Sequence, residues 1–261
     1  MDLTIGQYGL ALGSGGLVGF VLALIGGGGS VLAVPLLLYV VGVPTPHLAI
    51  GTSALAVAVN AGANAIPHWR RGTIKLRCAW VFSAFGVVGA LIGSTIGKSV
   101  DGDQLVAWFG LLMIAVGAWM LFGRGPPEQA EVRLDVSTAN RLVPRLGVSA
   151  LFVGLISGMF GVGGGFLIVP ALMLATHMPL VSAIASSSVA VAALGGATAA
   201  NYAVGGFVDW WLAAALLTGG IVGGIIGAAV AARLAKRRRV LSIVFSIGIA
   251  AAGVAVFAGN I

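Results

Sequence analysis

The chain has 261 residues, of which 14 are Lys or Arg and 7 are Asp or Glu. Charged residues make up 8% of it, against about 25% in a soluble globular domain, and hydrophobic residues make up 59%. A soluble fold of this size buries only about 70–75% of its surface, which is too little to hide so many apolar side chains. The composition therefore excludes soluble enzymes, nucleic-acid binders and disordered proteins, and it predicts an all-α protein that crosses a membrane several times.

The charged residues fall into a few short clusters and leave six charge-free stretches. A membrane-spanning helix needs about 20 apolar residues. Four of the stretches each fit one span, whereas the two long ones, of 67 and 63 residues, each fit three. The chain thus holds up to ten hydrophobic segments in the order 3+1+1 and again 3+1+1. The stretches are 3–69, 78–97, 104–123, 146–208, 210–232 and 240–261.

One hydrophilic linker, at 123–146, divides the chain into two similar halves. It carries Gly-Pro-Pro at 125–127, which prevents a continuous helix. We therefore expect a first transmembrane repeat at 1–122 and a second at 147–261. The N-terminus lacks the basic stretch of a signal peptide.

The two halves share a motif in which glycines precede a Val-Pro pair. Residues 25–38 read IGGGGSVLAVPLLL and residues 160–173 read FGVGGGFLIVPALM, which align at an offset of 135. Further pairs at that offset are Pro44 with Pro179 and Ser53 with Ser188; later glycines align at 134. Because glycines are common here, the two proline pairs are the more specific evidence of a repeat.

The positive charges predict that the two repeats are inverted. The loop at 68–77 carries four Lys or Arg, but its equivalent at 203–209 carries only Asp209. The loop at 98–103 is weakly acidic, but its equivalent at 232–239 carries five positive charges. Lys and Arg in short loops mark the cytoplasmic side, so both termini should be extracytoplasmic and the linker cytoplasmic. Inverted repeats are typical of secondary transporters and also occur in channels and some membrane enzymes.

The glycine runs are the strongest candidates for a binding site. Glycine costs about 1 kcal/mol relative to alanine inside a helix, so these runs should break the helix that contains them or form part of a re-entrant segment. Each helix that follows would point free N–H groups and the positive end of its dipole at the glycines, which makes an anion site without a formal charge. Simple packing or a kink is the alternative interpretation. The candidates are Gly26, Gly27, Gly28, Gly29, Ser30, Gly161, Gly163, Gly164 and Gly165.

Small polar residues later in each half are further candidates. Hydroxyls and amides converging from several helices would suit a tetrahedral oxyanion. The alternative is that they bond across packed transmembrane helices, at about 0.6 kcal/mol each. These residues are Thr52, Ser53, Asn60, Asn64, Ser186, Ser187, Ser188 and Asn201.

Other features carry less chemistry. The glycines of GVVGALIGSTIG at 86–97 and GGIVGGIIG at 219–227 have four-residue spacing, which predicts close helix packing. No carboxylate lies within an expected span, so a buried Asp or Glu proton relay is excluded. A single cysteine, Cys78, excludes a multi-thiolate metal site. We expect no cofactor, no metal site and no catalytic residue.

With its doubled glycine and Val-Pro motif, the sequence resembles the sulfite exporter TauE/SafE family. GTSALAV at 51–57, SSSVAVAA at 186–193 and the basic central loop also fit, and the resemblance covers essentially the whole chain. It implies a transporter of sulfite, sulfonates or related sulfur-containing anions in a bacterium or archaeon. It also implies about eight membrane segments, which with the charge pattern gives a range of eight to ten.

We therefore expect a non-enzymatic secondary transporter that moves a small sulfur-containing anion across the cytoplasmic (inner) membrane by alternating access. An anion channel with the same lining is the alternative. A membrane enzyme acting on lipid phosphate would need a buried nucleophile or carboxylate pair, and the sequence offers neither. The expected partners are the anion and the lipid bilayer, with a homodimer allowed and no nucleic acid.

Overall fold

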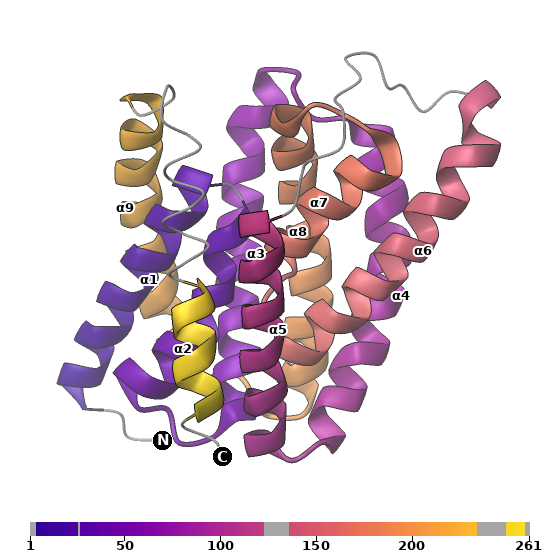
Figure 1. Cartoon of the computed structure of the whole chain (residues 1–261). Coiled ribbons are helices and arrows are strands. Elements are labelled where there is room, and N and C mark those ends of the chain that lie inside the picture. Colours follow the sequence, from indigo (N-terminus) through magenta and orange to yellow (C-terminus); the bar gives the residue numbers. More distant parts are fainter. Residues whose placement is uncertain (1–3, 26, 123–135, 234–248, 259–261) are drawn as a thin grey trace.

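The computed structural model describes residues 4–25, 27–122, 136–233 and 249–258. These ranges are helical and contain no strand. Helices α1, α3, α4, α6, α8 and α9 contain the six segments that are long and apolar enough to cross a membrane, which confirms a multi-pass, all-helical membrane protein. The helices are α1 Ile5–Ile25, η1 Gly27–Leu32, α2 Ala33–Pro35, η2 Leu36–Val41, α3 Pro46–Arg70, α4 Leu76–Ser99, α5 Gly102–Phe122, α6 Val136–Phe160, α7 Gly165–Thr176, α8 Leu180–Val204 and α9 Trp210–Arg233 (Figure 1).

Four shorter apolar helical segments accompany the six long ones. They lie at 29–41, 102–118, 165–176 and 249–258. The described part of the chain therefore has ten apolar segments, at the upper limit of the predicted range. The segments at 29–41 and 165–176 directly follow the two glycine runs, where the sequence predicts short or re-entrant helices.

Two pairs of outer helices cross at very close range. A Cβ added at Gly19 of α1 would overlap the Gly220 carbonyl of α9, and one added at Gly154 of α6 would overlap the Gly86 carbonyl of α4. Only glycine permits such backbone contact, as in small-residue crossings of membrane helices. The predicted packing role of the glycines at 86–97 and 219–227 is thus confirmed.

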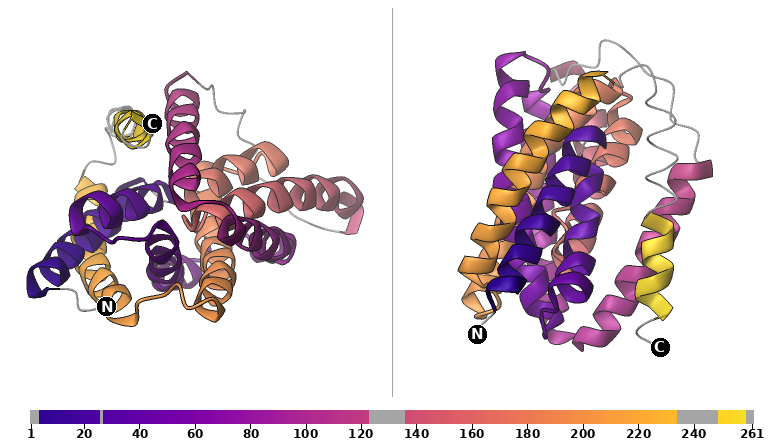
Figure 2. Two further views of the ribbon diagram at one scale, coloured as in Figure 1. Left: turned by 90° about the horizontal axis from the view of Figure 1, so that it is seen from below. Right: turned by 90° about the vertical axis from the view of Figure 1, so that its left-hand side faces the viewer.

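The centre of the bundle is formed by α3 and α8, which pack against each other. The pair α1 and α9 flanks α3, and the pair α4 and α6 flanks α8, while α5 and the helix at 249–258 stand to one side (Figure 2). Val57 of α3 and Val191 of α8 are each at most 2% exposed and belong to one core cluster. The middle of the bundle is therefore tightly packed.

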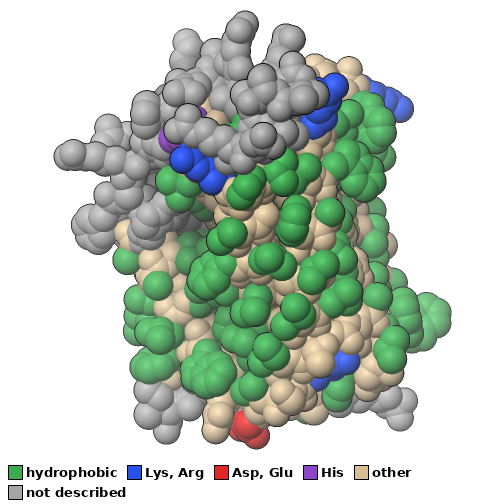
Figure 3. All heavy atoms as spheres, turned by 90° about the vertical axis from the view of Figure 1, so that its right-hand side faces the viewer, with side chains coloured by type: hydrophobic (Ala, Val, Ile, Leu, Met, Phe, Trp, Pro, Cys, Tyr) green, Lys and Arg blue, Asp and Glu red, His purple; other side chains and the backbone are tan. Residues whose placement is uncertain are grey.

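The two ends of the bundle differ in charge. Arg70 and Arg71 are exposed in the turn that joins α3 to α4, at the end of the bundle far from the start of α1 (Figure 1). Asp101 is exposed in the turn that joins α4 to α5, at the end where α1 begins. Figure 3 shows cationic side chains mostly at one end and acidic ones at the other. The assignment of the basic end to the cytoplasm stays a prediction, and residues 123–135 of the linker lie outside the described part.

Candidate substrate-binding site

The glycine run of the second half breaks the helix. Helix α6 ends at Phe160 and α7 begins at Gly165. Between them Gly161, Gly163 and Gly164 have φ of 65°, 65° and 68°. This left-handed backbone is one that L side chains rarely adopt, which is why the turn requires glycine. The predicted break at 161–165 is confirmed.

The break lies halfway along the bundle, between the two central helices. A Cβ on Gly163 would be 2.7 Å from Val57 Cγ1 of α3 and 3.1 Å from Val191 Cγ1 of α8. A Cβ on Gly161 would overlap Ile50 of α3. Because Val57 and Val191 are near the midpoints of their helices, non-helical backbone is present at mid-depth, where it is tolerated only if it is buried in protein or lines a cavity.

Helix α7 starts inside the protein with N–H groups that its own carbonyls do not bind. The Gly164 carbonyl accepts from the N–H groups of Leu167 and Ile168, both at 2.8 Å. The N–H groups of Gly165 and Phe166 precede these and have no acceptor within α7. Both residues are buried, Phe166 at 5% exposure. The helix dipole therefore presents its positive end, with N–H groups that α7 does not use, to the interior, as anion sites at helix N-termini do.

One hydroxyl beside this helix start was not predicted from the sequence. Ser157, near the end of α6, is 1% exposed, and its Oγ has no hydrogen-bond partner among the described residues. That Oγ lies 2.9 Å from the position of a Cβ on Gly164. Its only signal in the sequence is a difference between the repeats, since the residue 135 positions earlier is Leu22.

In the first half, the chain from Gly27 to Val41 forms an irregular helix rather than a turn and a regular one. It is a 3-10 helix over Gly27–Leu32, one α-helical turn at Ala33–Pro35 and a π-helix over Leu36–Val41. Predicted site residues Gly27, Gly28, Gly29 and the fully buried Ser30 all lie in its first turns, and Gly26 lies outside the described residues.

The two glycine-rich segments contact each other. The 3-10 helix packs against α7, and Val31 shares an apolar cluster with Val162 and Phe166. Gly29 packs against the α1 backbone at Leu22, where an added Cβ would overlap it. The segments thus meet in the middle of the molecule, as the repeat predicts, but with apolar side chains between them.

Of the predicted hydroxyls, Ser53 reaches the break. Its Oγ donates to the Ile50 carbonyl at 2.9 Å and lies 3.4 Å from the Gly161 carbonyl. Ser53 is fully buried. Its hydroxyl therefore joins α3 to the turn that precedes α7.

Two other predicted residues hold the beginnings of outer helices. Thr52 Oγ1 of α3 accepts a hydrogen bond of 3.0 Å from the N–H of Asp209, just before α9. Ser186 Oγ of α8 accepts one of 2.9 Å from the N–H of Lys75, just before α4. These contacts lie toward opposite ends of the bundle, so the structure does not bring Thr52 and Ser186 together.

The remaining residues of α3 and α8 are dispersed. Ser187 and Ser188 both donate to the Ile184 carbonyl of their own helix. Asn60, 7% exposed, packs its amide against Gly220 of α9, and Asn64 is partly buried one turn further on. The structure therefore brings Ser53 close to the second glycine run. It does not place the side chains of Ser187, Ser188, Asn60 and Asn64 there.

Asn201 belongs to a separate polar cluster with Lys98, which was not predicted to bind anything. Lys98 Nζ donates to the carbonyl and to Oδ1 of Asn201, at 2.9 and 2.7 Å. The Asn201 amide donates to Ser94 Oγ at 2.6 Å and Thr95 Oγ1 at 2.9 Å. This cluster links α4 to α8 near the acidic end of the bundle.

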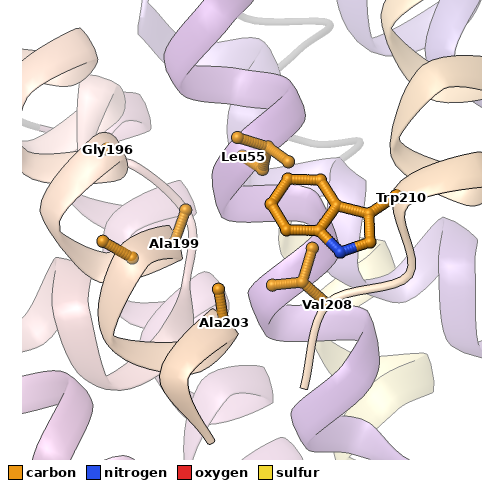
Figure 4. Close-up of a pocket in the computed structure, with 7 residues that line it drawn as sticks. Leu55, Gly196, Ala199, Ala203, Val208 and Trp210 are labelled. Atoms are coloured by element: carbon orange, nitrogen blue, oxygen red, sulfur yellow. The ribbon is translucent and has the colours of Figure 1, made fainter. Parts of the chain in front are cut away.

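A small apolar pocket lies between α3 and α8, beside Trp210 at the start of α9 (Figure 4). Its volume is about 210 Å³. Apolar residues line it, and the Trp210 indole lies across it from Ala199 and Ala203. It offers few polar groups and does not suit a small anion. Its lining is Leu55, Gly196, Ala199, Ala200, Ala203, Val208 and Trp210.

Comparison with known proteins identifies the family. Residues 11–256 match the family described as "Sulfite exporter TauE/SafE". The chain belongs to the TauE/SafE family. This confirms the resemblance carried by the two glycine and Val-Pro motifs, and the match spans both halves.

Relatives of this TauE/SafE chain are named as transporters. It is 48% identical over 252 residues to a "Probable membrane transporter protein" of Xylella fastidiosa (strain 9a5c), covering 97% of this chain and 95% of that one. It is 28% identical over 220 residues to "Probable membrane transporter protein YunE" of Bacillus subtilis, covering 78% and 81%. No solved structure gives a significant match. The protein is a membrane transporter of the TauE/SafE family.

Proposed function

We propose that this protein is a secondary transporter that carries sulfite, an organosulfonate or a related small oxyanion across the cytoplasmic membrane. The observation that carries the proposal is the buried start of α7, where a helix begins halfway along the bundle with unused N–H groups. A helix start at that depth suits a negatively charged ligand and does so without a Lys or Arg in the membrane interior. The proposal that the ligand contains sulfur rests on the description of the family, "Sulfite exporter TauE/SafE".

Alternating access requires two halves that exchange conformations, and the helix contacts support inverted repeats. Gly19 meets Gly220, and Gly154 meets Gly86. Gly19 and Gly154 are 135 positions apart, and Gly86 and Gly220 are 134 apart. The crossing of α1 with α9 thus has an equivalent in the crossing of α6 with α4, as expected when each repeat contributes its first helix to one pair and its fourth to the other.

The hydrogen bonds of two hydroxyl groups also occur in equivalent positions of the two halves. Thr52 and Ser186 are 134 positions apart, as are Lys75 and Asp209. In each case a hydroxyl of a central helix accepts from the N–H that precedes an outer helix, once toward each end of the bundle. We infer that the pseudo-two-fold axis passes between α3 and α8, so the α7 start and its first-half equivalent face each other across the midplane.

In this mechanism the anion rests at the start of α7 while α3 and α8 separate it from one face or the other. Ser53 ties the turn before α7 to α3, so movement of α3 is transmitted to the site. Exchange of conformations between the repeats then exposes the anion alternately to each side. With Lys and Arg at the cytoplasmic side, both termini face outward.

Counterflow in proteoliposomes tests the proposal. Purified protein is reconstituted with unlabelled sulfite inside, and uptake of labelled sulfite, thiosulfate, taurine and chloride is measured from outside. A transporter accumulates label transiently above equilibrium with at least one sulfur-containing anion. Uptake without trans-stimulation would instead indicate a channel, and no uptake of any sulfur-containing anion would refute the proposed substrate class.

A further inference from the structure

We infer that Ser157 donates a hydrogen bond to the bound anion and makes the second half the tighter half of the binding site. This inference rests on the proposed function, because it concerns the same helix start. It adds a specificity-determining side chain that neither the sequence motif nor the glycine break contains.

The position of Ser157 is the first argument. Its Oγ is 2.9 Å from where a Cβ on Gly164 would be, and Gly164 is the residue whose carbonyl begins α7. The side chain is 1% exposed. The hydroxyl therefore lies at the end of the helix where the N–H groups of Gly165 and Phe166 have no acceptor within α7.

The unpaired state of the hydroxyl is the second argument. A serine within a helix ordinarily bonds back to a carbonyl of the preceding turn, as Ser187 and Ser188 do here. Ser157 Oγ has no partner among the described residues, and a buried polar group without a partner is unfavourable. Such a group is expected where a ligand completes the bonding.

The chemistry of these donors defines the ligand. One hydroxyl comes from α6 and two backbone N–H groups come from α7, so an anion with several acceptor oxygens satisfies them together. Sulfite and sulfonate groups present three oxygens on one sulfur. A chloride ion has no such arrangement, so the hydroxyl should contribute more to the binding of sulfur oxyanions than to that of halides.

The equivalent place in the first half lacks this donor. Gly29 packs against the α1 backbone at Leu22, whereas Gly164 packs against the Ser157 side chain, and each residue of the first pair lies 135 positions before its equivalent in the second. The side chain of Leu22 has no hydrogen-bond donor for an anion. The two helix starts are therefore unequal, and the hydroxyl assigns the stronger interaction to α7.

Isothermal titration of the purified full-length chain with sodium sulfite, and separately with sodium chloride, tests this role. We expect Ser157→Ala to weaken sulfite binding by at least about tenfold, equivalent to about 1.4 kcal/mol, with a smaller effect on chloride. Ser83→Ala is the matched control, because Ser83 of α4 is also buried with an unpaired hydroxyl. Ser83 lies at least about 9 Å closer to the basic end than Ser157, counted along α4 and α6 from the contact of Gly86 with Gly154, and its loss should not affect binding.

Thermal unfolding without ligand separates a binding role from a structural one. Both alanine variants should unfold at or above the temperature of the unmodified protein, because each removes a buried hydroxyl that has no partner. If Ser157→Ala binds sulfite as tightly as the unmodified protein, or if Ser83→Ala weakens binding equally, the inference is overturned while the proposed function stands. If the unmodified protein binds no sulfur oxyanion, the proposed function fails first.

Discussion

The segments 27–41 and 161–176 have similar sequences, contact each other and yet fold differently. The second turns sharply on glycines with positive φ and then starts a regular helix at Gly165. The first runs as a 3-10 helix and ends in a π-helix before Gly42. One motif therefore gives two unequal helix starts.

The two helix starts also differ in the groups that lie beside them. Gly164 faces the side chain of Ser157, whereas Gly29 faces the α1 backbone at Leu22 and Val18. A helix start next to a hydroxyl donor suits an anion better than one that lies against closely packed backbone. The difference indicates that inverted repeats need not share a ligand equally, and that α7 is where substitutions should affect transport most.

The largest expected effect is that of Gly164→Ala. An alanine at this position would have to keep a left-handed backbone conformation, at a cost of about 1–2 kcal/mol, and its Cβ would lie 2.9 Å from Ser157 Cβ and Oγ. We expect sulfite transport in proteoliposomes to fall more than about tenfold, because small displacements of binding groups are costly.

Gly206→Ala is the control for that prediction. Gly206 has φ of 77°, but nothing lies within 4 Å of an added Cβ, so only the backbone strain is shared. Its transport should match that of the unmodified protein when equal amounts are reconstituted. Equal transport by the two variants would show that the start of α7 is not special.

A smaller effect is expected from Asn201→Leu, which tests a contact present in one half only. The substitution removes the Oδ1 acceptor of Lys98 and the amide donor to Ser94 and Thr95, and leaves Lys98 only the main-chain carbonyl of residue 201. The residue 134 positions earlier is Pro67, which has no such side chain. Hydrogen bonds to charged groups are worth about 1.5–3 kcal/mol, so the free energy of unfolding of the detergent-solubilised protein should fall by roughly that amount.

If Asn201 instead binds the anion, Asn201→Leu will weaken sulfite affinity without changing the unfolding of the ligand-free protein. Asn64→Leu provides a comparison on α3, since Asn64 is partly buried and takes part in no cluster of this kind that the described residues reveal. It should change the free energy of unfolding much less.

The smallest effects should be matched between the repeats. Thr52→Val and Ser186→Ala each remove the acceptor of one N–H, of Asp209 and of Lys75 respectively. Each should lower the free energy of unfolding by about 1 kcal/mol. Chemical denaturation of both variants measures this, and a cost in one variant at least twice that in the other would contradict their equivalence.

Much of the architecture can be predicted from the sequence, because charged residues and glycines affect the segment in which they lie. Charge-free stretches between Arg and Lys clusters predict the apolar segments, since a span must avoid charge. Glycines ahead of Pro170 predict the break before α7. The irregular helix before Gly42 was not predicted, because the same Val-Pro motif in α7 is compatible with a regular helix.

The site was harder to predict because its side chains depend on tertiary contacts. A serine in an apolar run is ordinarily bonded to its own helix, so the difference between Ser157 and Leu22 did not indicate a site until the lack of a partner for Ser157 was visible. The roles of Thr52 and Ser186 depend on where α9 and α4 begin, which pattern alone does not reveal. Lys98 was assigned to a loop, whereas it lies in the last turn of α4 and bonds to α8.

The most direct measurement is the location of an anion that can be identified by its own scattering. Selenite has the charge and shape of sulfite, and selenium gives an anomalous signal in crystals grown with it. We expect an anomalous peak at the start of α7, within hydrogen-bonding reach of Ser157 Oγ and the N–H of Gly165. A peak beside Lys98 or at the Arg70–Arg71 turn, with none at α7, would contradict it.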